Sequence, residues 1–172
     1  MYSYRVTKYN PEYRVNGAYT RDEWTSVADV GKAVNWNEYL SVENNYVNAV
    51  IAFMEKVRVS VLEVSNLEKY DTLQLYADQD IYLSKDMDEL YRKIKNGVYL
   101  KKNDIEHLVR IVLREYLWCK LVHTPDVFVH FGYDYYMYFG CSFQLDDEFI
   151  QQLHLLGLFV EEMISPYNDN NI

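Results

Sequence analysis

The sequence predicts an α+β fold: a single domain with a mainly antiparallel sheet, a central aromatic hairpin and about four packing helices. Two short aromatic and β-branched runs, 127–131 and 135–139, flank a Gly-Tyr-Asp loop at 132–134, which is the composition of a β-hairpin. Helical and strand patterns interleave without a regular βαβ rhythm or a glycine-rich βα turn. The 172 residues, of which 49% are hydrophobic, are enough for one core, so 1–172 is expected to be one domain.

The hairpin is expected in the middle of the sheet. In its first run Val127, Val129 and Phe131 alternate with Phe128 and His130, so neither side is clearly polar. A half-exposed strand would carry a polar residue at every second position. Other parts of the chain must therefore cover both faces of this hairpin.

The first part of the chain changes from strand to helix. Residues 2–9 alternate as a strand does, and 12–34 form an irregular stretch. Asn35 with Glu38 three residues later is a helix-capping pattern, and an apolar stripe at helical spacing then continues to Val57. This helix is expected to lie flat on the sheet.

The middle of the chain is less regular. Residues 58–64 are β-branched and alternating, which predicts a strand after the helix. The segments 73–76 and 80–83 are candidates for a further pair of strands. A second capping pattern at Asp86 predicts a short helix that stops at the Asn-Gly pair 96–97.

The last part contains the clearest helix. Asn103 is expected to cap a helix whose apolar residues continue to Tyr116 at helical spacing. Residues 117–122 can follow as a strand that leads into the hairpin. A final helix is predicted at 146–164, with acidic residues in its first turn, and 167–172 is expected to be a flexible tail.

The net charge of −9 is distributed unevenly. Residues 1–120 contain all 17 Lys and Arg and 18 of the acids, whereas 121–172 contain no Lys or Arg and eight acids. Those eight are Asp126, Asp134, Asp146, Asp147, Glu148, Glu161, Glu162 and Asp169. Such a field repels nucleic acid and anionic lipid and attracts basic proteins. The alternative is that the acidity serves solubility alone.

The start of the chain lacks the apolar segment of a signal peptide, and its uncharged runs are too short to span a bilayer. The cytoplasm is therefore the expected compartment, with no membrane partner. Cys119 and Cys141 are the only cysteines and neither lies in a CxxC pair, which favours buried, reduced thiols.

The common catalytic signatures are absent: there is no Walker A loop, GxGxxG, HExxH, GxSxG or EF-hand loop. No cofactor is expected. The rival interpretation is a small metal-dependent enzyme or metal-binding protein that uses His123, His130, Asp126 and Asp134 around the hairpin. Lone histidines among aromatic residues are more often structural, and Cys141 near His130 is expected to be inert because burial raises a thiol pKa.

Tyrosine is unusually frequent, at 18 of 172 residues. Tyrosines concentrate at binding hot spots, and those at 133, 135, 136 and 138 cannot all point inward from one hairpin. An aromatic patch rimmed by carboxylates suits a partner surface rich in Lys and Arg. The predicted partner-binding residues are Asp126, Tyr133, Asp134, Tyr135, Tyr136, Asp146, Asp147 and Glu148. The acids at 146–148 can equally serve only to stabilise the first turn of a helix.

Three segments carry a resemblance to a known class of proteins. YRVTKYNP at 4–11, DEWTSVADVGK at 22–32 and HFGYDYYMY at 130–138 resemble small bacterial immunity proteins of polymorphic toxin systems. The resemblance implies a cytosolic, non-enzymatic inhibitor that binds a cognate toxin domain, often a nuclease with a basic active site. A regulatory subunit or homodimer that uses the same aromatic face is a third interpretation, which the concentrated negative charge disfavours.

Overall fold

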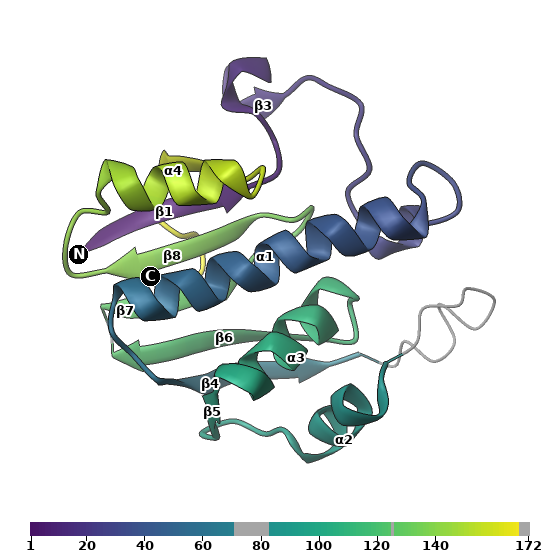
Figure 1. The fold of residues 1–172 in the computed structure, drawn as a ribbon, viewed down its shortest axis with the longest axis vertical. Helices are drawn as coiled ribbons and strands as arrows, with labels where there is room; N and C mark the ends of the chain where they lie inside the picture. The colour runs from purple at the N-terminus through teal and green to yellow at the C-terminus, as the bar shows by residue number, and fades with distance from the viewer. Residues whose placement is uncertain (71–82, 125, 169–172) are drawn as a thin grey trace.

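A seven-stranded antiparallel sheet forms the framework of the protein (Figure 1). The computed structural model describes residues 1–70, 83–124 and 126–168. In spatial order the strands are β5 (Tyr99–Lys101), β4 (Val61–Lys69), β6 (Leu117–Thr124), β7 (Val127–Phe131), β8 (Met137–Cys141), β1 (Tyr2–Thr7) and β9 (Phe159–Glu162). The predicted α+β class with a mainly antiparallel sheet is confirmed, and β7 of the hairpin is the middle strand.

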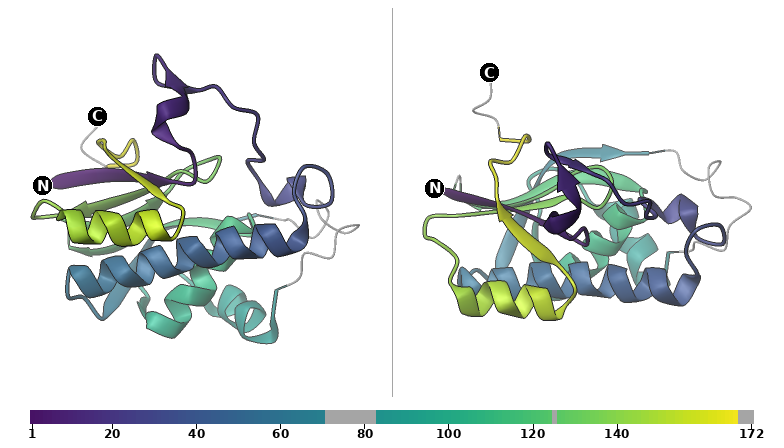
Figure 2. Two further views of the ribbon diagram at one scale, coloured as in Figure 1. Left: turned by 45° about the horizontal axis from the view of Figure 1, so that its top comes forward. Right: turned by 90° about the horizontal axis from the view of Figure 1, so that it is seen from above.

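The helices of the described residues lie on one face of this sheet (Figures 1 and 2). They are α1 (Trp36–Lys56), α2 (Lys85–Lys93), α3 (Lys102–Leu113) and α4 (Asp147–Leu155). Two 3₁₀ turns, η1 (Pro11–Tyr13) and η2 (Val27–Asp29), occur in the segment between β1 and α1. A two-stranded ribbon, β2 (Arg14–Val15) and β3 (Ala18–Tyr19), stands apart from the main sheet. None of the helices in the described part of the chain combines the length and the apolar character that a membrane crossing requires.

Both faces of the central hairpin are covered, as predicted. On the helical face Phe139 of β8 is fully buried and stacks on Phe53 of α1, with ring centroids 4.3 Å apart. On the opposite face His130 is buried beneath the C-terminal segment, and its Nδ1 lies 2.9 Å from Ser165 Oγ. Tyr167 packs its ring against Trp118, His130 and Tyr138 on that face. This residue, predicted to begin a flexible tail, therefore belongs to the cover of the sheet.

The prediction of one helix over 146–164 is wrong after Leu155. Gly157 adopts φ 72°, the left-handed conformation that glycine tolerates, and its N–H donates to His154 O at 2.8 Å. The N–H of Leu158 donates to Leu153 O at 3.0 Å, which completes a Schellman cap. The chain then reverses and enters the sheet as β9, antiparallel to β1.

The beginnings of two other helices differ from the predictions. Helix α2 is capped by Ser84, whose Oγ accepts the N–H of Met87, and not by Asp86. Helix α3 starts at Lys102 without a side-chain cap, so Asn103 lies inside it. By contrast, Asn35 caps α1 as predicted, because its side chain accepts the N–H of Glu38 at 2.9 Å.

Strand boundaries shift for local reasons. The predicted strand 58–64 is realised as β4, which begins only at Val61 because Arg58 has φ 59° and turns the chain out of α1. The three-residue strand β5, which pairs with β4, was not predicted. The strands proposed at 73–76 and 80–83 fall almost entirely outside the described residues. The second hairpin strand begins at Met137, two residues later than predicted.

A buried ion pair connects helices α1 and α3. Glu43 of α1 is fully buried, and its carboxylate accepts from Arg114 Nε at 2.6 Å and Nη2 at 2.9 Å, and from Arg110 Nη1 at 2.8 Å. Because the carboxylate is surrounded by donors, its burial is compensated. Removing it would leave the Arg114 guanidinium, itself buried, without this acceptor.

We therefore expect Glu43→Ala to lower the free energy of unfolding by about 3–5 kcal/mol, since it leaves buried positive charge behind. Urea denaturation measures this effect. The matched control is Glu55→Ala in the same helix, whose pair with Lys102 is exposed and should contribute less than about 1 kcal/mol. Equal losses in the two variants would contradict a special role for the buried pair.

Candidate functional site

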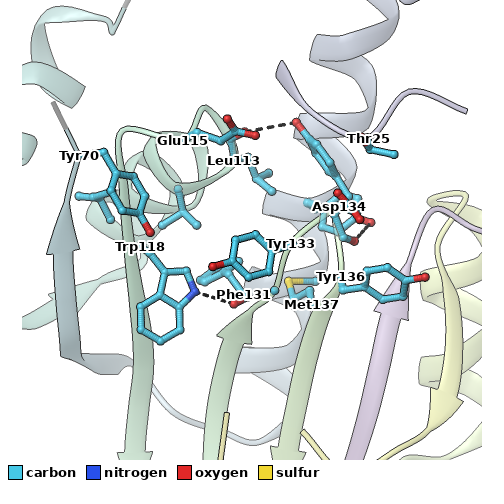
Figure 3. Close-up of a pocket in the computed structure, with 15 residues that line it drawn as sticks. Thr25, Tyr70, Leu113, Glu115, Trp118, Phe131, Tyr133, Asp134, Tyr136 and Met137 are labelled. Carbon is cyan, nitrogen blue, oxygen red and sulfur yellow. Dashed lines mark hydrogen bonds between the residues drawn. The ribbon is translucent and has the colours of Figure 1, made fainter. Parts of the chain in front are cut away.

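A pocket of about 400 Å³ lies at the end of the sheet where β7 passes into β8 (Figure 3). Its lining comes from the β7–β8 loop at 132–136, from the turn that joins α3 to β6, and from single residues of three other segments. Buried apolar side chains of Leu113, Leu117, Phe131 and Met137 contribute to it. This volume and apolar lining are typical of sites that receive a small ligand or a side chain.

Three aromatic rings gather on one side of this pocket. They belong to Tyr70, Trp118 and Tyr133, and Figure 3 shows them close together. The Nε1–H of Trp118 donates to Phe131 O at 2.7 Å, which fixes the ring and uses its only polar atom. The ring of Tyr133 is 83% exposed. Trp118 therefore lines the pocket as an immobilised aromatic surface, beside a tyrosine that solvent can reach.

The loop that carries Tyr133 has a closed backbone. The N–H of Gly132 donates to Tyr136 O at 2.6 Å, and the N–H of Tyr136 donates to Tyr133 O at 3.0 Å. Asp134 and Tyr135 have φ values of 55° and 61°, in the left-handed region. That conformation is tolerated by aspartate but costs a tyrosine on the order of 1–2 kcal/mol. The loop therefore needs an opposing source of stability.

The buried side chain of Tyr135 stabilises this loop conformation. This ring is only 5% exposed, and it makes edge contacts with Trp24, Tyr39 and Tyr46, at centroid distances of 5.1, 6.4 and 5.5 Å. Its hydroxyl donates to Leu113 O at 3.3 Å. Burial raises the pKa of Tyr135 well above its ordinary value, so the hydroxyl stays a donor. Tyr135 thus anchors the loop, and Tyr133 and Asp134 project from it.

The charged groups of the pocket are negative. Asp134 is exposed and Glu115 is half-buried, and no Lys, Arg or His occurs among the described residues that line the cavity. Within the described residues Asp134 forms no ion pair. A smaller cavity of about 160 Å³ shares Tyr70, Trp118, Gly132 and Tyr133 with the first and adds Glu68 and Tyr167. Carboxylates from three segments therefore surround one group of rings.

The eight residues predicted to form one binding surface lie at two ends of the sheet. Tyr133, Asp134, Tyr135 and Tyr136 are in the β7–β8 loop at the pocket, whereas Asp126 precedes β7 and the acids at 146–148 follow β8 at the other end. Strands β7 and β8 each have five residues, so they separate the two ends by roughly 13 Å. The structure does not bring all eight residues together.

Some predicted binding residues already have partners within the chain. Asp146 caps α4 by accepting the N–H of Phe149 at 3.0 Å, and it also contacts Lys56, whose ammonium lowers the pKa of the Asp146 carboxyl. Tyr136 points away from the pocket rings in Figure 3, and its hydroxyl accepts from Arg14 Nη1 at 3.0 Å. Of the predicted residues at the pocket, Tyr133 and Asp134 remain exposed.

The positive charge of the first two thirds of the chain also neutralises part of the C-terminal acidity. Glu161 of β9 accepts from Arg5 Nη2 of β1 at 2.8 Å, and Arg14 Nε lies 3.4 Å from the same carboxylate oxygen. Conversely, Glu68 and Glu115 at the pocket come from the first 120 residues. The acidic character of the pocket therefore arises from folding and not only from the uneven charge of the sequence.

Sequence reasoning missed Trp118, Tyr70 and Glu115. The alternation of residues 117–122 puts the side chain of Trp118 on the other face of the strand from Leu117 and Cys119. No local pattern indicates that Trp118 lies at the same end of the sheet as the β7–β8 loop. Glu115 has φ 59° in the turn after α3, and sequence offers no glycine or asparagine there to signal that turn. Only the packing of α3 and β6 against the hairpin places these residues at the pocket.

The groups proposed for a metal site do not converge. In the described part of the chain no three His, Cys, Asp or Glu side chains lie together in a way that could hold a metal ion. His130 and Cys141 occupy opposite faces of the sheet, because His130 contacts the C-terminal segment and Cys141 follows the helical-face alternation of β8. Burial raises the pKa of Cys119 to about 12.

No protein-family model, no curated protein and no solved structure matches this chain. Functional proposals therefore rest on its own residues and their arrangement.

We expect very different losses of stability at two loop positions that are separated by one residue. Tyr133→Ala should change the free energy of unfolding by less than about 0.5 kcal/mol, because the ring is exposed. Tyr135→Ala should cost about 3–5 kcal/mol, because it empties a buried aromatic site. Urea denaturation of both variants measures this. A large loss for Tyr133→Ala would mean that this ring is part of the core.

The two thiols provide a separate test. Both cysteines are buried, and burial raises the pKa of Cys119 and of Cys141. At pH 8 the native protein should therefore react with an aromatic disulfide reagent about a thousandfold more slowly than the same protein in denaturant. In denaturant two thiols per chain should react. Rapid modification of native protein would reveal an accessible, activated cysteine.

Proposed function

We propose that this protein is a non-enzymatic cytoplasmic inhibitor that binds and neutralises a cognate bacterial toxin domain with a basic surface. The observation that carries the proposal is the pocket at the β7–β8 loop. Its described lining combines aromatic rings with the carboxylates of Asp134 and Glu115 and contains no basic side chain. The resemblance of three sequence segments to immunity proteins supplies the class of partner, and a nuclease active site is one basic surface of that kind.

The physical chemistry of the pocket suits such a partner. Aromatic faces attract Lys and Arg cations, and carboxylates form charge-assisted hydrogen bonds with them. A nanomolar complex requires about −12 kcal/mol, which a few well-packed anchors can supply. Because hydrogen bonds and the buried Tyr135 ring already hold the loop, little conformational entropy is lost when a partner docks on Tyr133.

The proposal concerns the pocket end of the sheet. Asp126, Asp147 and Glu148 at the other end are exposed and contribute to the overall negative field, which speeds encounter with a basic protein. The proposal does not require these three acids to contact the partner surface that docks at the pocket.

The test is to measure binding to the protein encoded by the adjacent reading frame. Asp134→Asn and Tyr133→Ala should each raise the dissociation constant at least tenfold, and together about a hundredfold or more, because both anchors are lost. Matched controls at other places are Glu148→Gln, which also removes one exposed acid, and Tyr99→Ala, which removes a tyrosine that is 60% exposed on β5. Both controls should change affinity less than about threefold.

Two outcomes would contradict the proposal. If the adjacent protein does not bind, the inhibitor role fails. If Glu148→Gln weakens binding while Asp134→Asn does not, the docking surface lies at α4 and the pocket is not the site.

A further inference from the structure

We infer that the pocket is a receptor for a guanidinium group, so that one arginine side chain of the partner enters it. The inference rests on the proposed function for the origin of that arginine, but its chemistry follows from the chain itself.

Sets of a cation, an aromatic ring and a carboxylate recur in this structure. Arg14 lies 5.4 Å from the ring centroid of Tyr136 and 3.4 Å from the carboxylate of Glu161. Arg114 lies 5.5 Å from the ring of Trp36 and binds Glu43. In each set the ring and the carboxylate contact the same guanidinium, which combines a cation–π contact with a charge-assisted hydrogen bond or ion pair.

A third set uses a lysine. Lys8 Nζ lies 4.2 Å from the ring of Trp24 and 3.1 Å from the carboxylate of Glu23. Arg5 forms a fourth set, 5.3 Å from the ring centroid of Tyr136 and 2.8 Å from the carboxylate of Glu161. Three of these four internal cations are therefore arginines, and the side chains of all four are largely buried.

The pocket contains two of the three components of such a set, an aromatic ring and a carboxylate, but not the cation. Trp118 and Tyr133 supply the rings and Asp134 supplies an exposed carboxylate, yet no Lys, Arg or His lines either cavity among the described residues. The 17 positions outside the described residues, 71–82, 125 and 169–172, contain no Lys or Arg in the sequence. A cation that completes this set must therefore come from a partner.

The apolar part of the lining favours arginine over lysine. Leu113, Leu117 and Met137 would remove water from an entering cation. The guanidinium is planar and weakly hydrated, stacks on aromatic faces and pairs with a carboxylate through two N–H groups, whereas an ammonium is compact and strongly hydrated. An anion is disfavoured by the negative charges of Asp134 and Glu115.

The experiment is a titration of ¹⁵N-labelled protein with N-acetylarginine amide, followed by heteronuclear NMR. The indole N–H signal of Trp118 and the amide signals of Tyr133 and Asp134 should shift saturably. N-acetylcitrulline amide, which has the same shape without the charge, should bind at least about tenfold more weakly, and N-acetyllysine amide should bind several-fold more weakly than the arginine probe. Signals of α4 should stay in place.

Variants make the result specific to the site. Asp134→Asn should weaken binding of the arginine probe at least about threefold, whereas Glu148→Gln should leave it unchanged. Tyr133 is exposed, so Tyr133→Ala is expected to fold normally and to lose most of the probe affinity. Absence of saturable shifts, equal binding of the citrulline or the lysine probe, or insensitivity to Asp134→Asn would each overturn the guanidinium assignment.

The two proposals fail separately. If the arginine probe binds but the adjacent encoded protein does not, the pocket chemistry stands and the inhibitor role falls. If that protein binds with the expected dependence on Tyr133 and Asp134 while the probe does not bind, the inhibitor role stands and the guanidinium assignment falls.

Discussion

The buried ring of Tyr135 is the constraint on which the candidate site depends. It joins the irregular N-terminal segment through Trp24, helix α1 through Tyr39 and Tyr46, and helix α3 through Leu113 O. These contacts offset the cost of a left-handed tyrosine. Because the backbone is held in that conformation, the two residues just before Tyr135 are directed outward. Tyr133 and Asp134 are thus exposed because the buried ring of Tyr135 holds the loop in place.

Three arginines of this acidic chain are held inside the fold by carboxylates and aromatic rings. Arg5, Arg14 and Arg114 are each buried and placed against acids within the chain. Cation–π contacts hold all three guanidinium groups further: Arg5 and Arg14 lie over the ring of Tyr136, and Arg114 lies over Trp36. The pocket rings have no such internal cation among the described residues, so their surroundings remain negative. This absence separates the pocket rings from the rings of Tyr136, Trp36 and Trp24, each of which contacts a cation of the chain.

Part of the candidate site could be predicted from the sequence. Tyr133 and Asp134 fall in the loop of an obvious hairpin, and such loop residues face solvent. The other carboxylates and rings could not be placed, because Glu68, Glu115 and Trp118 come from elements whose position relative to the hairpin depends on strand order. Asp126 and the acids at 146–148 are grouped with the loop in the sequence analysis because all of them lie in the part of the chain after Lys120, which has no Lys or Arg. The chain reverses direction between β7 and β8, so the loop that joins them lies at one end of the sheet. The residues that precede β7 and those that follow β8 lie at the other end.

The sequence by itself determined the local elements: the hairpin through its two aromatic runs, α1 through the Asn35 cap, and the core face of α3 through its apolar spacing. These signals are local because caps and periodicity involve residues a few positions apart. Only the tertiary structure decided that β1 lies between β8 and β9, which pairs Arg5 with Glu161 across 156 positions, and that Gly157 ends α4 so that β9 can form. Which charges are neutralised and which tyrosines stay exposed depends on such long-range pairings, and no local pattern encodes them.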